Sequence, residues 1–260
     1  MIIDSHAHLE MSEFDSDREE VIKRATEAGV GFIITVGINL EFSLKAVSLA
    51  QKHKNIYASI GVHPHDVARA DNNTYDALKE LAHQQKKRVV AYGEIGLDFF
   101  RNISAREIQL KAFGRQLELA QELNLPVIIH DRKAHKQCIE MIKSSGVRQG
   151  VFHCFSGDYE MAKKCMDLGF YISVPGVVTF DKAKTIQNVA EHVPLSSLLL
   201  ETDAPYLAPI PYRGKRNEPS FVIHTAKKVA DIKRIPFEEV AEVTACNTMN
   251  LFGIEVSAKN

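Results

Sequence analysis

Short apolar runs rich in β-branched residues recur along the whole chain, and a segment with helical spacing of apolar positions follows each run. Runs that are apolar at nearly every position are typical of parallel strands, because helices cover both faces of such a sheet. The runs occupy eight segments: Met1–His8, Gly31–Ile38, Ile56–His63, Val89–Gly96, Val127–Arg132, Gly150–Phe155, Phe170–Pro175 and Leu198–Asp203. Eight strand–helix units in about 250 residues predict a (β/α)₈ barrel of the TIM type.

The segment between the fourth and fifth runs illustrates the predicted helices. Ser104 and Glu107 match the S-x-x-E pattern of a capping box, which would begin a helix here. Apolar residues at helical spacing between Leu110 and Ala120 predict one buried stripe. Pro126 cannot continue a helix and precedes the fifth strand.

No change of composition and no glycine- or serine-rich linker divides the chain, so we expect one domain over residues 1–260. An open, doubly wound sheet is the main alternative. Its first strand would end in a glycine-rich turn. Here the first run ends in His-Ala-His instead, which favours the barrel.

Composition narrows the functional classes. The net charge of −1 predicts no general attraction to nucleic acid, so any affinity for phosphate must be local. The N-terminal segment lacks the pattern of a secretory signal, and no apolar run reaches the roughly 20 residues of a membrane span. The four cysteines form no C-x-x-C pair. We therefore expect a cytoplasmic protein with reduced thiols and without an obligate protein partner.

Polar residues stand at the ends of six of the predicted strands. They are His6, His8, His63, Glu94, His130, His153, Glu201 and Asp203. Because residues two apart in a strand share a face, His6 and His8 should both point into the barrel mouth, and Glu201 should accompany Asp203. The carboxyl ends of barrel strands are where enzymes of this fold place their chemistry.

A lone histidine at a strand end is usually a hydrogen-bonded structural residue. The chain has 11 histidines in 260 residues, and chance would rarely fill four chosen strand ends. Five other histidines fall in predicted helices and are interpreted as surface or packing residues, namely His53, His83, His135, His192 and His224. The role of His65, just after the third strand, stays open.

Imidazole and carboxylate donors without cysteine favour Zn²⁺, Mn²⁺, Fe²⁺, Ni²⁺ or Co²⁺ over an all-oxygen Mg²⁺ site, although Mg²⁺ remains a candidate. The candidate ligands are His6, His8, Glu94, His130, His153 and Asp203. Six donors exceed what one catalytic metal ion needs. Since Glu94 could bridge, we expect two divalent metal ions.

Several longer motifs carry a family resemblance. They are DSHAH at 4–8, GVHP at 61–64, GEIGLD at 93–98, His130, HCFSG at 153–157, LETDAP at 200–205 and RGKRNEP at 213–219. In these motifs, and in Asn247 with the tail Asn250–Phe252, the chain resembles the TatD family of metal-dependent deoxyribonucleases over essentially its whole length.

The resemblance implies one metal ion on His6, His8, Glu94 and Asp203, and a second on Glu94, His130 and His153. Glu94 takes the place of the carboxylated lysine that often bridges the metals in the wider amidohydrolase superfamily. No ligand position departs from the family pattern.

A two-metal site can activate water and clamp the oxygens of an in-line phosphoryl displacement. In that mechanism Glu94 bridges the ions and Asp203 accepts the proton of the attacking water. His63 would donate to a phosphate oxygen, with a packing role as the alternative. Glu201 and Asp98 are expected to orient metal ligands, and a structural role is the alternative for both.

A loop after the eighth strand holds the candidate substrate-binding residues. Tyr206 offers a ring that can stack on a base, and Arg213 and Lys215 offer cations for phosphate, with Tyr212 and Arg216 nearby. A solvated loop would have a similar composition. The short loop favours DNA or a short oligonucleotide as substrate, cleaved as an exonuclease or with single-strand preference.

Two other functions remain open. The first is a related hydrolase that attacks a carbonyl carbon, because the same metals polarise C=O. Amidases, lactonases and ester deacylases belong to this group, and so do enzymes that remove an aminoacyl group from tRNA. A metal-binding protein without catalytic activity is the second alternative.

Overall fold

Eight parallel strands form one sheet in the order β1 to β8 in a computed structural model that describes residues 1–255. The strands are β1 (Ile2–Ala7), β2 (Val30–Val36), β3 (Ile56–Ile60), β4 (Val89–Asp98), β5 (Val127–Arg132), β6 (Gly150–Phe152), β7 (Phe170–Val174) and β8 (Leu198–Leu200). A parallel bridge between Ala7 and Ala204 brings the end of β1 against the segment after β8. This arrangement confirms the predicted (β/α)₈ barrel, because an open doubly wound sheet would not bring its first strand beside its last.

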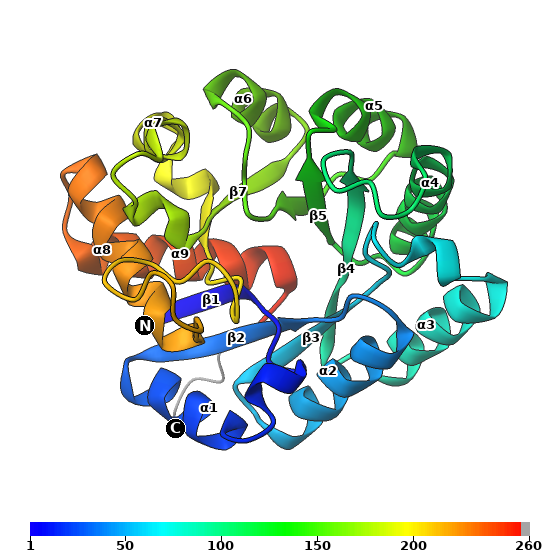
Figure 1. Cartoon of the computed structure of the whole chain (residues 1–260), viewed down its shortest axis with the longest axis horizontal. Helices are drawn as coiled ribbons and strands as arrows, with labels where there is room; N and C mark the ends of the chain where they lie inside the picture. Colours follow the sequence, from blue (N-terminus) through cyan, green and yellow to red (C-terminus); the bar gives the residue numbers. More distant parts are fainter. Residues whose placement is uncertain (256–260) are drawn as a thin grey trace.

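Helices alternate with the strands and surround the barrel (Figure 1). They are α1 (Arg18–Glu27), α2 (Leu40–Lys52), α3 (Asn72–Gln84), α4 (Arg106–Glu122), α5 (His135–Ser145), α6 (Tyr159–Asp167), α7 (Lys184–His192), α8 (Val222–Lys233) and α9 (Phe237–Phe252). Short 3₁₀ helices are η1 (Ser12–Phe14), η2 (Val67–Arg69), η3 (Gly176–Thr179), η4 (Leu195–Ser197) and η5 (Pro219–Phe221). Among residues 1–255, no helix is both long and apolar enough to cross a bilayer.

The predicted capping box at the start of α4 is wrong. Helix α4 begins at Arg106 and has no side-chain cap. The Ser104 hydroxyl instead donates to the carbonyl of His65 at 3.0 Å, so it ties two loops together at the barrel mouth. A true capping box begins α3, where the Asp71 side chain accepts from the backbone of Thr74.

Buried side chains from strands that are not neighbours meet one another inside the barrel. One apolar cluster contains Ile34 of β2, Ile128 of β5, Val151 of β6 and Leu199 of β8. Leu251, Phe252 and Ile254, at and after the end of α9, pack into the same cluster. His130 is two residues after Ile128 and His153 is two after Val151, so the inward side of β5 and β6 changes from apolar to polar toward the carboxyl ends.

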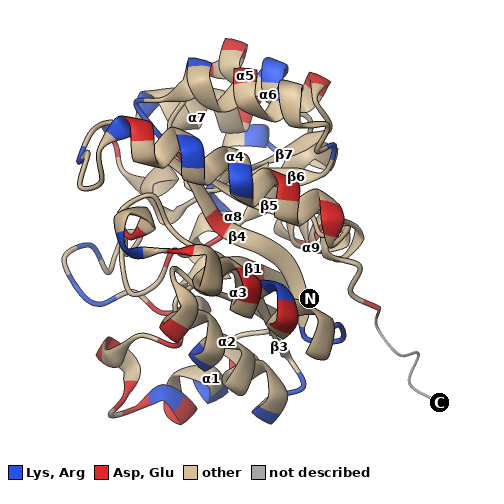
Figure 2. Cartoon of the chain, turned by 90° about the vertical axis from the view of Figure 1, so that its right-hand side faces the viewer, with Lys and Arg blue, Asp and Glu red and all other residues tan. Residues whose placement is uncertain are grey.

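Charged residues of both signs are mixed over the helices that cover the barrel (Figure 2). This surface agrees with the net charge of −1 and leaves any attraction for phosphate to local groups. The single domain over residues 1–260 stays a prediction, and its last five residues, 256–260, lie outside the described residues.

Candidate metal centre

All six predicted metal ligands meet at the carboxyl ends of the strands. His6, Glu94 and His130 lie within β1, β4 and β5. His8 and His153 follow β1 and β6 by one residue. Asp203 comes three residues after β8, which ends earlier than the sequence predicts. The parity that paired Glu201 with Asp203 therefore does not apply there, and Asp203 has a left-handed backbone with φ of +57°.

The two oxygens of Glu94 face two different groups of nitrogen atoms. Oε1 lies 2.7 Å from Nδ1 of His130 and 2.7 Å from Nε2 of His153. Oε2 lies 3.6 Å from Nε2 of His6 and 3.8 Å from Nε2 of His8. One buried carboxylate thus stands between two clusters of imidazoles.

Asp203 completes the cluster on the Oε2 side. Its Oδ1 lies 3.7 Å from Nε2 of His6 and 3.5 Å from Nε2 of His8. The two imidazole nitrogens are themselves 3.2 Å apart. The Asp203 side chain is 13% exposed against 4% for Glu94, so the more accessible carboxylate is Asp203.

Three carboxylates lie behind the histidines, on the side away from Glu94. Glu10 Oε1 is 3.3 Å from Nδ1 of His8, which also donates to the carbonyl of Val36 at 2.9 Å. Asp98 Oδ2 is 3.4 Å from Nε2 of His130, and Glu201 Oε1 is 3.9 Å from Nδ1 of His153. A carboxylate that accepts a hydrogen bond from the outer N–H of a histidine leaves the inner nitrogen with its lone pair for a metal ion; His8 has such bonds here, and the carboxylates near His130 and His153 lie at longer distances.

His63 differs from the candidate ligands because the nitrogen that faces the site carries its proton. Its Nε2 lies 3.4 Å from Glu94 Oε1 and 3.3 Å from Nδ1 of His130, close enough to form part of a third group of potential ligands. The backbone N–H of His65, however, donates to Nδ1 of His63 at 3.1 Å. The neutral ring therefore carries its proton on Nε2, which makes that atom a hydrogen-bond donor and not a ligand.

Burial and neighbouring groups shift the pKa values of the residues at the site in different directions. Burial lowers the pKa of both His6 and His63 to about 4, so these rings are neutral at neutral pH. Burial opposes protonation of His130 as well, but hydrogen bonds to Asp98 and Glu94 raise the pKa of His130 to about 9. Burial would raise the pKa of Glu94, yet the surrounding histidines hold that pKa well below its ordinary value.

The donor set fits divalent metal ions. Imidazole nitrogens of His6, His8, His130 and His153 converge on the carboxylates of Glu94 and Asp203. Ring nitrogens of His6 and His8 lie 3.2 Å apart, and those of His130 and His153 lie 3.3 Å apart, so a cation between the members of a pair would bind both nitrogens once their protons are lost. The chain therefore has candidate metal-binding clusters of histidine, aspartate and glutamate.

A cavity of about 810 Å³ opens over these clusters. Its lining includes the predicted residues His63, Glu94, Asp203 and Tyr206, and the undecided His65 also faces it. The predicted substrate-binding residues Arg213 and Lys215 are not part of the lining. Arg213 lies over the ring of Phe180 and Lys215 over that of Tyr212.

Other residues of that loop are engaged elsewhere. Arg216 forms a bidentate pair with Asp17, with N–O distances of 2.8 and 2.6 Å. The ring of Tyr212 stacks on Phe221, with the centroids 3.9 Å apart. Both side chains therefore hold the loop against the barrel, and only Tyr206 and Leu207 of this region reach the cavity.

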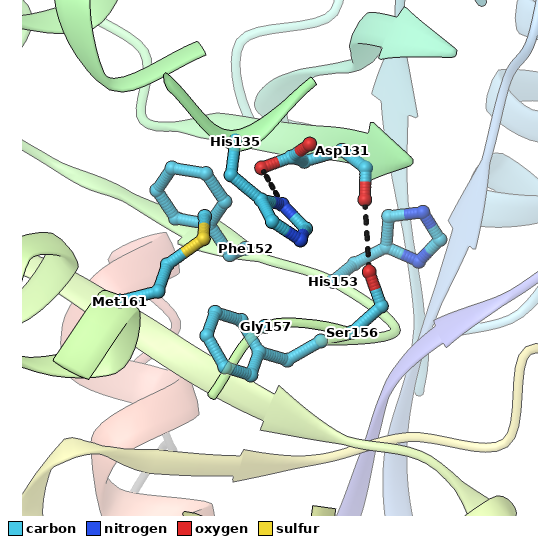
Figure 3. A pocket seen from close by; sticks show the side chains of 8 residues that line it. Asp131, His135, Phe152, His153, Ser156, Gly157 and Met161 are labelled. Atoms are coloured by element: carbon cyan, nitrogen blue, oxygen red, sulfur yellow. Dashed lines mark hydrogen bonds and ion pairs between the residues drawn. The ribbon is translucent and has the colours of Figure 1, made fainter. Parts of the chain in front are cut away.

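A smaller pocket lies behind His153 (Figure 3). The carboxylate of Asp131 lies 2.8 Å from Nδ1 of His135, and the Ser156 hydroxyl donates to the carbonyl of Asp131. The pocket has no room for a water molecule. His135 is therefore a packing residue at the start of α5, and His53, predicted in a helix, directly follows α2 as its C-cap.

Sequence reasoning missed several groups at the site. Glu10 is buried, although it follows the first strand where a surface residue would be ordinary, and Thr35 donates to it at 2.6 Å. Arg101, Arg132 and Lys182 line the cavity from three separate loops or strand ends. The two-residue spacing of His6, His8 and Glu10 is the one pattern that would have pointed to Glu10.

Known proteins match this chain over nearly its full length. The family model described as TatD related DNase matches residues 3–253. The uncharacterized metal-dependent hydrolase YabD of Bacillus subtilis is 42% identical, and the match covers 98% of this chain and 100% of that protein. The 3'-5' ssDNA/RNA exonuclease TatD of Erwinia amylovora is 38% identical over 97% of this chain and 100% of that protein.

A solved structure agrees in fold as well as in sequence. The crystal structure of YjjV, a TatD homologue from Escherichia coli, has a TM-score of 0.93 and 34% identity, with 98% of both chains covered. A family match over almost the whole chain, joined by relatives of this identity and a barrel of the same shape, leads to one conclusion. The chain belongs to the TatD related DNase family of metal-dependent hydrolases.

Proposed function

We propose that this chain hydrolyses phosphodiester bonds of DNA with two divalent metal ions, and that short or single-stranded DNA is its substrate. His6, His8, Glu94 and Asp203 would hold one ion, and Glu94, His130 and His153 the other. The relative from Erwinia amylovora, which is named as an exonuclease on single-stranded DNA and RNA, supports this substrate class.

One observation carries the two-ion proposal. Each oxygen of the Glu94 carboxylate faces its own pair of imidazole nitrogens, at 2.7 Å on one side and 3.6–3.8 Å on the other. A single ion would need only one of these oxygens. A carboxylate buried between two sets of donors is the arrangement expected of a ligand shared by two ions.

Divalent ions, when bound, would supply Lewis acidity toward a phosphate oxygen and lower the pKa of water. Asp203 is then suited to act as the general base. Burial would raise the pKa of Asp203, but the hydrogen bond with His8 and the neighbouring histidines outweigh it and keep that pKa below its ordinary value, so Asp203 is ionised at neutral pH. Its partial exposure to the cavity lets it accept a proton from water that attacks phosphorus.

His63 is suited to bind the substrate. Its Nε2–H points toward the two clusters, and the backbone N–H of His65 fixes this tautomer. A donor at that position would bind a non-bridging phosphate oxygen and stabilise the charge that grows on it. Tyr206 lines the cavity and would stack on a base, while phosphate binding by Arg213 and Lys215 stays a prediction.

The test combines metal analysis with a choice of substrates. The purified protein, loaded with Mn²⁺ or Zn²⁺ and dialysed, should retain close to two ions per chain by mass spectrometry of the metals. It should shorten a single-stranded oligonucleotide and act far more slowly on an activated carboxylic ester. Cleavage of the ester alone would support the carbonyl-hydrolase alternative, and metal binding without either activity would contradict the enzymatic function.

A further inference from the structure

An exposed aromatic side chain lies next to two arginines that line the cavity. Phe100, which follows β4, is 60% exposed, although large apolar side chains are normally buried. The guanidinium of Arg132, at the end of β5, lies 4.3 Å from the centre of its ring. Arg101 and Arg132 both line the cavity, so Phe100 is adjacent to two cavity-lining cations, one next to it in the chain and one over its ring.

Both guanidinium groups lack a polar partner among the residues that the structure describes. Within residues 1–255, the side chains of Arg101 and Arg132 form no hydrogen bond and no ion pair, in contrast to Arg216 with its bidentate pair to Asp17. Five N–H donors on each group remain available for a ligand. An arginine fork is matched to the oxygens of a phosphate group.

The loop that carries Phe100 is fixed by buried groups. Asp98 Oδ1 accepts from the backbone N–H groups of Phe100 at 2.9 Å and of Arg101 at 2.7 Å. Gln109, which is fully buried, holds the backbone N–H and carbonyl of Asp98 from the side of α4. The backbone N–H of Phe99 donates to the carbonyl of Arg132, which sets the two strand ends side by side.

Asp98 also connects this loop to the candidate metal centre. Its second oxygen, Oδ2, lies 2.8 Å from Nε2 of His65 and 3.4 Å from Nε2 of the predicted ligand His130. One buried carboxylate therefore orients a candidate metal ligand with one oxygen and the backbone of Phe100 and Arg101 with the other. A group bound at this loop is held at a fixed position relative to the metal centre.

We propose that Phe100, Arg101 and Arg132 form a nucleotide subsite for single-stranded nucleic acid, in which the free face of the Phe100 ring stacks on an unpaired base and the two arginines bind backbone phosphate. The subsite rests on the proposed phosphodiesterase function and deepens it. A base has a π-face whatever its sequence, so stacking here is independent of sequence. In double-stranded DNA the bases are paired and stacked within the duplex, so they are not available to stack on the ring of Phe100.

The subsite would also set the path of a bound strand across the cavity. Tyr206 reaches the cavity from the segment after β8, and Phe100 stands at the ends of β4 and β5, with the candidate metal centre between them in the barrel mouth. Two aromatic rings on either side of the reacting phosphate would hold the nucleotides that flank the cleaved bond.

Binding of a fluorescein-labelled oligothymidylate, measured by fluorescence anisotropy in EDTA, tests the subsite without cleavage. Phe100→Ala should weaken binding on the order of 10- to 100-fold, the loss that accompanies removal of one stacked base. Phe100→Tyr should restore it, whereas Phe100→Leu should not, because leucine keeps apolar area but lacks the ring. Arg101→Gln and Arg132→Gln should each reduce the slope of log affinity against log salt by about 0.7.

Ile103→Ala is the matched control, because Ile103 lies on the same loop and is 61% exposed. It should bind the oligonucleotide as the unchanged protein does. Equal weakening by Ile103→Ala and Phe100→Ala would mean that the loop acts through its apolar surface, and it would overturn the subsite. Wild-type affinity in Phe100→Ala, or no binding by the unchanged protein, would also overturn it.

Turnover separates this inference from the proposed function. With metal bound, Phe100→Ala should raise KM for the oligonucleotide and leave hydrolysis of bis(p-nitrophenyl) phosphate, which has no base, unchanged. If the oligonucleotide binds through Phe100 and is not cleaved, the proposed function fails and the subsite stands. If it is cleaved with an unchanged KM in Phe100→Ala, the subsite fails and the proposed function stands.

Discussion

Replacement of Glu94 by glutamine separates the two candidate ion sites. The amide keeps the shape of the side chain, but one oxygen becomes an NH₂ group without a lone pair for a metal ion. Because Oε1 faces His130 and His153 while Oε2 faces His6 and His8, either orientation of the amide deprives one cluster of its carboxylate oxygen. Glu94→Gln should therefore affect one ion more than the other.

The expected loss of metal ions from Glu94→Gln follows from the ligands that remain in each cluster. The first cluster keeps His6, His8 and Asp203, whereas the second keeps only His130 and His153 of its predicted ligands. The second ion should be lost first, so the content should fall from two ions toward one per chain. Loss of a partner behind a ligand weakens metal binding by about 10- to 100-fold, and loss of a direct ligand should exceed that. This corresponds to more than about 1.4–2.7 kcal/mol.

The assay is metal content after dialysis, followed by calorimetric titration with Mn²⁺ and by cleavage of an oligonucleotide across the same titration. Activity of Glu94→Gln should recover in part with excess metal. Glu107→Gln, an exposed position on α4, is the control for loss of one negative charge and should keep both ions. Two tightly bound ions in Glu94→Gln would refute the bridging role of this carboxylate.

Three other predictions follow from the same geometry. Asp203→Asn should keep most of its metal and lose about 10²- to 10⁴-fold in turnover, measured with oligonucleotide at saturating metal; near-normal cleavage would eliminate Asp203 as the base. Glu10→Gln should weaken metal binding by about 10- to 100-fold through His8, and unchanged affinity in a calorimetric titration would contradict that role. Because the pKa of His130 is raised to about 9, a proton competes with metal below that pH, so apparent metal affinity should rise with pH up to about 9; a flat dependence in titrations at several pH values would argue against His130 as a ligand.

The sequence by itself was sufficient for the barrel and for the predicted ligand set. Continuous apolar runs at eight places require strands covered on both faces, and this pattern is local. The histidines at 6, 8, 130 and 153 stand where those runs end, so strand parity alone predicts that they share the barrel mouth. The same local reasoning failed at β8, because the strand ends at Leu200 and the chain then turns through a left-handed residue at Asp203.

Only the tertiary structure determined which polar groups contact one another and which remain available to a ligand. Asp98 and Glu201 lie behind His130 and His153 through contacts that join distant segments, and no spacing in the sequence encodes those distances. The basic residues of the 213–216 loop and those at 101 and 132 look alike in composition. The fold pairs Arg216 with Asp17 and leaves Arg101 and Arg132 on the cavity wall, because the availability of a charge depends on what packs beside it in three dimensions.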